Sequence, residues 1–186
     1  MNTAFVIFDR MTALDFVGVY DPLTRLRSMN LLPGFEWKIC SFTEEVMDDR
    51  GLHFSPDLVR GSLGEYDLLV VPGGFGTRTL QHNGAFLDWL RSAGSVKLKA
   101  SVCTGALLLG AAGFLQGKRA TTHPDAYEAL APYCDRIVDE RVVDEGDVIT
   151  ARGVTAAIDL GLYIVEWLAG YEARKRIAKQ MDYHWH

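Results

Sequence analysis

Cysteine is scarce in this chain, with only three in 186 residues. Cys40, Cys103 and Cys134 are odd in number and widely separated, and no pair has the spacing of metal ligands. A disulfide framework is therefore not expected, and neither a metal nor an organic cofactor is expected. Unpaired thiols are typical of a reducing compartment, so we expect a cytoplasmic protein.

Positive charge and long apolar runs are also lacking. The chain has 19 Lys and Arg against 24 Asp and Glu, which gives a net charge of −5, and no basic block. Nucleic-acid binding selects for basic faces, so no nucleic-acid partner is expected. The most apolar long segment, 154–169, is interrupted by Asp159 and Glu166. Neither a membrane span nor a signal peptide is expected.

Short apolar runs that alternate with helical segments are what the chain does contain. Strands are predicted over 3–8, 36–42, 66–71, 96–102 and 119–122, with further short strands between 136 and 151 and a small excursion from the sheet near 45–56. Helices are predicted from a start between 15 and 22 to about 29, and over 86–93, 104–114, 124–131, 155–168 and 171–181. This alternation indicates an α/β fold, a flavodoxin-like, doubly wound and mostly parallel sheet with helices on both faces. The length suits one domain over residues 1–186.

Cys103 is predicted at the corner between a strand and a helix. The stretch "SVCTG" places small residues, Ser101 and Gly105, two positions to either side of the thiol. Strand-to-helix corners of this kind hold a nucleophile out at a strained turn. The N-terminus of the following helix is expected to stabilise the thiolate and to lower the pKa of Cys103. The alternative is a buried structural cysteine.

The motif "PGGFG", Pro72 to Gly76, ends another predicted strand. Glycine allows close approach of the backbone to a ligand and leaves N–H groups free. The amides of Gly74, Phe75 and Thr104 are therefore candidates for an oxyanion hole beside Cys103. The alternative is a plain strand-to-helix turn. No Lys-Ser/Thr pair follows, which excludes a Walker-type phosphate loop.

A thiol nucleophile needs an acid or base within reach. Asp15 follows the first strand and is a candidate, with an N-cap as its alternative role. Asp21 before Pro22 is a rival cap, which would leave Asp15 free for chemistry. His123 is a further candidate. The alternative is a histidine that is exposed to solvent or has its hydrogen bonds satisfied within the core.

Three stretches, "YDLLVVPGGFG", "SVCTGALLLGAAGFLQGKRATTH" and "VITARGVTAAIDLGLYIVEWLAG", resemble the ThiJ/PfpI superfamily along nearly the whole chain. The "LDF-x-G" start and the cysteine segment are most similar to its isonitrile hydratase branch. The resemblance implies a lyase with Cys103 as the nucleophile, Asp15 as its acid/base partner and Thr104 as a required side chain. It also implies a small isonitrile substrate and a homodimer, for which the "LLPGF" loop and the terminal helices offer apolar surface.

The sequence departs from that branch at two places and leaves rival functions open. Gly18-Val19 stands where the branch has Gly-Pro, and Arg152 precedes Gly153 where the branch has a second glycine. We expect Arg152 to line the pocket or the dimer interface. Glyoxalase or deglycase-like chemistry on 2-oxoaldehydes needs the same cysteine and carboxylate, and redox or ligand sensing needs only an accessible thiol. A peptidase is disfavoured because no histidine follows Cys103.

Overall fold

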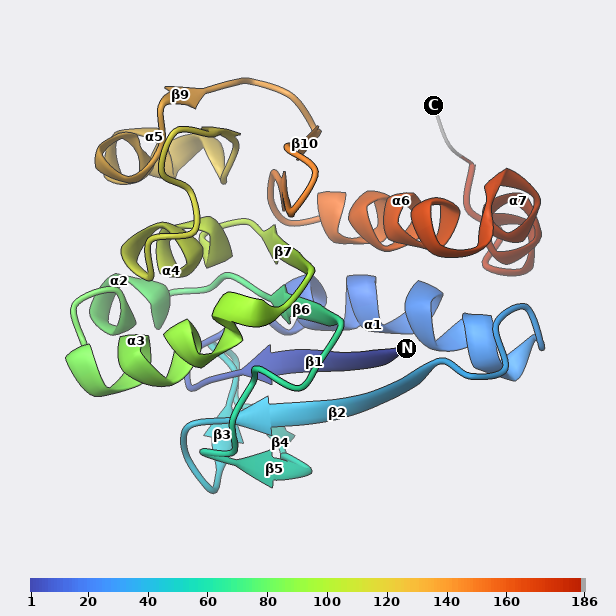
Figure 1. Cartoon of the computed structure of the whole chain (residues 1–186), viewed down its shortest axis with the longest axis horizontal. Helices are drawn as coiled ribbons and strands as arrows, with labels where there is room; N and C mark the ends of the chain where they lie inside the picture. The colour runs from blue at the N-terminus through green and yellow to red at the C-terminus, as the bar shows by residue number, and fades with distance from the viewer. Residues whose placement is uncertain (185–186) are drawn as a thin grey trace.

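A seven-stranded sheet forms the centre of the computed structural model, which describes residues 1–184 (Figure 1). Its strands are β1 (Asn2–Ile7), β2 (Glu36–Ser41), β5 (Leu58–Val59), β6 (Leu68–Val71), β7 (Leu98–Val102), β10 (Val142–Asp144) and β11 (Val148–Ala151). They lie in the order β10-β11-β7-β6-β1-β2-β5. Every neighbouring pair is parallel except β10 and β11 at one edge. The predicted mostly parallel α/β sheet is confirmed.

Two small sheets lie outside the main one. β3 (Val46–Met47) and β4 (His53–Phe54) pair antiparallel, which confirms the predicted excursion. β8 (Arg119–Ala120) pairs with β9 (Arg136–Ile137), so the strand predicted over 119–122 is shorter than expected and does not join the main sheet.

The helices are α1 (Ala13–Ser28), α2 (Thr77–Leu80), α3 (Gly84–Arg91), α4 (Gly105–Ala111), α5 (Tyr127–Leu130), α6 (Ala156–Ala169) and α7 (Tyr171–Gln180). The short α2 was not predicted. The helix predicted over 124–131 is interrupted, because 3₁₀ turns with prolines near their starts flank α5. No helix of the described residues has the length and apolarity needed to cross a bilayer.

The start of α1 differs from the prediction. Thr12 occupies the N-cap position, and Pro22 lies inside the helix, so Asp21 before Pro22 is not a cap. Asp21 instead forms an ion pair with Arg25 one turn later. Pro22 lacks the N–H that an interior helix residue donates, and its ring packs closely on Gly161 of α6.

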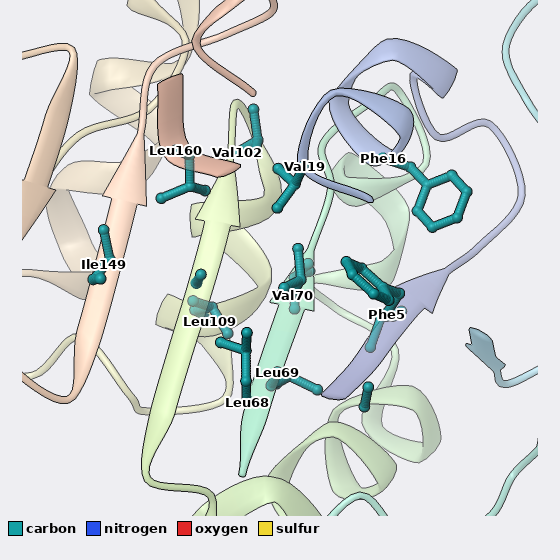
Figure 2. Packing of buried hydrophobic residues seen from close by; sticks show 14 of the residues in the cluster. Phe5, Phe16, Val19, Leu68, Leu69, Val70, Val102, Leu109, Ile149 and Leu160 are labelled. Atoms are coloured by element: carbon teal, nitrogen blue, oxygen red, sulfur yellow. The ribbon is translucent and has the colours of Figure 1, made fainter. Parts of the chain in front are cut away.

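Helices cover both faces of the sheet and close an apolar core around its central strands. α1 packs against α6 and α7, while α4 contacts β6 and β7 and is itself flanked by α2 (Figure 1). β6 and β7 are buried along their whole length. Figure 2 shows four members of this core that come from four elements, namely Val19 of α1, Leu160 of α6, Val102 of β7 and Leu109 of α4.

The parallel register brings the ends of three strands together. β6 lies between β1 and β7, with Val70 beside both Phe5 and Ala100. The segments that follow β1, β6 and β7 therefore meet at one edge of the sheet, where ligands of such folds bind. Asp15, the "PGGFG" turn and Cys103 belong to these segments.

Candidate active site

Cys103 adopts the strained backbone that the sequence predicts for the corner. Its φ is +54°, which is uncommon for a residue with a side chain. Its N–H donates to the Ala151 carbonyl at 3.0 Å, and its own carbonyl accepts the Thr122 hydroxyl at 2.7 Å. These bonds to β11 and to the segment after β8 hold the strained residue in place.

Two glycines leave room for the thiol. A Cβ on Gly153 would lie 2.6 Å from Sγ of Cys103, and one on Gly73 would lie 2.8 Å from its Cβ. Neither distance is compatible with a side chain, so both positions require glycine for the sulfur to sit where it does.

Asp15 lies directly beside this corner. It is fully buried, and one carboxyl oxygen accepts the Gly73 N–H at 3.1 Å. Among residues 1–184 the other oxygen has no hydrogen-bond partner. The Cys103 thiol is close enough for the two groups to shift each other's pKa. Asp15 is therefore not a capping residue, and the structure brings it to the cysteine as predicted.

Burial dominates the acid–base behaviour of this pair. It raises the pKa of Asp15 to about 7, with a further upward contribution from the charge of Asp49 and opposing effects of the Gly73 N–H and the Cys103 thiol. Burial first, and then the negative charge of Asp15, raises the pKa of Cys103 to about 12. The prediction of a lowered thiol pKa is wrong, because desolvation outweighs the Thr104 N–H at the helix start. The thiol is neutral when Asp15 is charged.

Thr104 and Gly74 are bonded to each other. The Thr104 hydroxyl accepts the Gly74 N–H at 2.9 Å and lies 3.1 Å from the Gly74 carbonyl, to which it can donate. The side chain makes no cap bond to its own helix. Because its amide is occupied, Gly74 does not serve as an oxyanion donor, which corrects that prediction. The Thr104 N–H faces the sulfur, and the Phe75 N–H has no acceptor within residues 1–184.

A cavity of about 260 Å³ opens above the thiol. Its volume lies below the ~300–1,000 Å³ of pockets for drug-sized ligands, so it suits a small substrate. The lining residues are Thr12, Asp49, Arg50, Gly74, Phe75, Arg78, Cys103, Thr104, His123, Asp125 and Val154. The sequence analysis missed Thr12, Asp125 and Val154, and it also missed the charged Asp49, Arg50 and Arg78. The only signal for them was their charge in turns next to the excursion and the "PGGFG" motif.

His123 lines this cavity, whereas Arg152 does not. Nδ1 of His123 accepts the Asp125 N–H at 3.2 Å, so this ring nitrogen is already hydrogen-bonded within the local turn. The guanidinium of Arg152 pairs with Asp139, outside the lining of the cavity. The sequence-based expectation that Arg152 lines the pocket is therefore wrong, and its alternative, a dimer interface, stays a prediction.

The other two cysteines have no comparable surroundings. Cys40 is fully buried in β2, and burial raises the pKa of its thiol. Cys134 is half-buried, follows a 3₁₀ turn and contacts the Leu130 carbonyl at 3.8 Å. Within residues 1–184 no three His, Cys, Asp or Glu side chains are grouped to hold a metal ion.

Comparison with known proteins agrees with this geometry. The DJ-1/PfpI family pattern matches residues 1–167. The chain is 37% identical to an isonitrile hydratase of Pseudomonas putida over 98% of its length and 78% of that protein. It is 38% identical to Protein DJ-1alpha of Drosophila melanogaster over 63% of its length and 55% of that protein. The crystal structure of a ThiJ/PfpI family protein from Pseudomonas syringae superposes with a TM-score of 0.90 at 30% identity, covering 100% of this chain and 76% of that one.

Proposed function

The chain belongs to the DJ-1/PfpI family, and from that premise we propose that it is an isonitrile hydratase, a lyase that converts a small isonitrile, R–N≡C, into an N-substituted formamide. The observation that supports this most is the Cys103 thiol beside the buried Asp15 carboxyl, at the floor of a small cavity. A similarity to an isonitrile hydratase along 98% of the chain adds to it.

The first step adds the thiol to the isonitrile carbon. Asp15 as the carboxylate takes the proton from the neutral Cys103 thiol, and the sulfur forms a bond to the terminal carbon. Asp15 then delivers the same proton to that carbon, which leaves a thioimidate, R–N=CH–S–Cys103. A carboxyl with a pKa of about 7 both accepts and donates a proton near neutral pH, as this relay requires.

The second step hydrates the thioimidate. Asp15 removes a proton from water as its oxygen bonds to the carbon, and the proton goes to nitrogen. The resulting R–NH–CH(OH)–S–Cys103 collapses as the hydroxyl loses its proton and the C–S bond breaks. The thiol regains a proton, and R–NH–CHO leaves. The overall reaction therefore adds one water to the isonitrile to give the formamide. The amides of Phe75 and Thr104 are the candidates to stabilise negative charge that develops beside the sulfur.

The cysteines support a proposal for the compartment. All three are free thiols, and the proposed reaction requires Cys103 to remain reduced, so we place the enzyme in a reducing cytoplasm.

The test is an assay of purified protein with cyclohexyl isocyanide, and with methylglyoxal as the competing substrate class. We expect formamide production that Cys103→Ser lowers by at least about a thousandfold, the scale for loss of a nucleophile. Cys134→Ser is the matched control and should retain activity, because this thiol lies outside the cavity lining. Turnover of methylglyoxal with no turnover of the isonitrile would overturn the proposal in favour of glyoxalase chemistry.

A further inference from the structure

A guanidinium without a carboxylate partner stands at the mouth of the cavity. Arg78 lines the same cavity as Cys103 and forms no ion pair with any residue in 1–184. Its guanidinium carbon lies 5.1 Å from the centre of the Phe75 ring. Arg10 lies over the same ring at 5.8 Å and likewise has no carboxylate partner within the described chain. The half-exposed Phe75 ring thus carries two cations beside the entrance.

The other charges of the cavity do not cancel this positive charge. Asp49 is bonded to Arg50 at 2.5 Å and accepts the Thr12 hydroxyl at 3.3 Å, so these two charges balance each other. Asp125 is 86% exposed and lies 3.7 Å from Nδ1 of His123, and within residues 1–184 it forms no ion pair with Arg78. An unneutralised cation at Arg78 remains.

The geometry assigns this cation to the far end of the substrate. The reacting carbon must lie against the sulfur of Cys103, which is only 6% exposed at the floor of the cavity. The R group of the isonitrile then extends toward the mouth, where Phe75 and Arg78 lie. A cavity of about 260 Å³ that is lined by both Cys103 and Arg78 leaves room for an R group of a few atoms.

We propose that the substrate is an isonitrile whose R group ends in a carboxylate, and that Arg78, steadied on Phe75, binds this carboxylate. The proposal rests on isonitrile hydration as the proposed function. A planar guanidinium binds a carboxylate through two parallel hydrogen bonds, which a neutral R group cannot use. The product is then an N-formyl amino acid, so a reaction that hydrolyses or transfers a formamide would consume it.

The test compares 3-isocyanopropanoate with n-butyl isocyanide, a neutral molecule of similar length. We expect the wild-type enzyme to prefer the acid by about tenfold or more in kcat/KM, since hydrogen bonds to charged groups are stronger than neutral ones. Arg78→Gln should abolish this preference, and Arg78→Glu should reverse it. Arg119→Gln, which removes an arginine paired with Glu145 elsewhere, is the matched control and should keep the wild-type ratio.

A binding measurement separates this inference from the proposed function. Calorimetry with N-formyl-β-alanine and N-butylformamide on Cys103→Ser reports the anion preference without turnover. Hydration of n-butyl isocyanide with no preference for the acid, in turnover or in binding, would overturn the anion site and leave the hydratase standing. If neither isonitrile is hydrated, the hydratase proposal fails, and equal binding of the two formamides would also reject the anion site.

Discussion

At the scale of single residues, the burial of Asp15 decides which chemistry the site can perform. Its carboxyl is fully buried with one backbone donor, so the charged form loses hydration that the Gly73 N–H only partly replaces. The pKa of about 7 follows from this imbalance. The same burial keeps the Cys103 thiol protonated, so the pair transfers a proton during the reaction and does not hold a thiolate in the resting enzyme.

The raised pKa of Asp15 predicts a pH-dependent stability. Between pH 4 and 7 the folded state keeps the proton that the unfolded state has lost, so the free energy of unfolding falls as pH rises through this window. Asp15→Asn stays neutral at every pH. We expect the free energy of unfolding of Asp15→Asn to increase relative to that of the wild type as pH rises. The increase should be on the order of 1.4 kcal/mol for each unit of raised pKa and should be complete above pH 7.

Urea unfolding of both proteins at pH 4, 5.5 and 8 measures this difference. Asp125→Asn is the control, because that carboxylate is 86% exposed and should give no such trend. A difference between wild type and Asp15→Asn that is constant across the three pH values would contradict a raised pKa.

The Thr104 hydroxyl is bonded to the Gly74 backbone, so its loss should affect both stability and catalysis. Thr104→Val removes the partner of the Gly74 N–H, and a buried unpaired group costs ~1–3 kcal/mol, whereas the Gly74 carbonyl still accepts the Thr77 hydroxyl at 2.8 Å. We expect kcat on an isonitrile to fall about a hundredfold, because the hydroxyl lies beside the sulfur and holds the adjacent turn. A measurable fall in the melting temperature should accompany it.

Thr104→Ser separates the hydroxyl from the rest of the side chain. It retains the oxygen and loses only a methyl group, so kcat should stay within a few-fold of the wild type. Steady-state kinetics and thermal melts of the two variants provide the comparison. Near-normal turnover by Thr104→Val would remove Thr104 from the catalytic group.

At the scale of secondary-structure elements, close packing of α1 on α6 positions Asp15. A Cβ on Gly18 would lie 2.6 Å from Cβ of Ala157, and one on Gly161 would lie 2.4 Å from Cγ of Pro22. The two helices therefore approach one another at glycines. Asp15 lies three residues before Gly18, so any movement of α1 also moves the carboxyl relative to Cys103.

Gly18→Ala should disturb both packing and catalysis. Overpacking of this kind costs ~1–3 kcal/mol in the free energy of unfolding, and a displaced α1 should lower kcat on an isonitrile. Gly84→Ala is the control, because a Cβ there meets no atom within 4 Å and the residue starts α3, away from the site. Equal stability and activity of the two variants would show that α1 has room to adjust.

At the scale of the whole molecule, the apolar surface agrees with expectation on the terminal helices, where Trp167 and Tyr171 are exposed, and differs from it at the "LLPGF" loop. The "LLPGF" loop contributes little, because Phe35 is fully buried and the two leucines pack against the core. Further exposed apolar side chains, which were not expected, occur on α1 at Leu14 and Val17 and on the β3–β4 excursion. Leu14 and Leu52 line one hollow, which makes this surface continuous.

We expect this surface to be buried in a homodimer. Light scattering after size exclusion should give twice the chain mass at micromolar concentration, and Leu14→Lys should shift the protein toward monomer. Val59→Lys, which changes an exposed apolar residue on β5, should leave the mass unchanged. A monomeric wild type at these concentrations would refute the dimer.

Local sequence was enough to predict the α/β sheet and the strained corner at Cys103, whereas Asp15 as its partner was implied by the family resemblance and, from the residues, was one candidate among others. Apolar periodicity and small residues around a turn involve only neighbouring positions, so they can be recognised in the sequence alone. The start of α1 was misjudged because the Asp-Pro pair imitates a cap, while the helix begins earlier, after Thr12, and Pro22 lies in its interior against Gly161 of α6.

The direction of the thiol pKa, the bond between Gly74 and Thr104, and the cations at the cavity mouth could not be predicted in that way. Each depends on groups far apart in the chain, such as Thr104 and Gly74, which meet only when β6 and β7 pair. Desolvation is set by everything that surrounds a group. The helix start favours a thiolate at Cys103, and the burial created by the folded chain outweighs it.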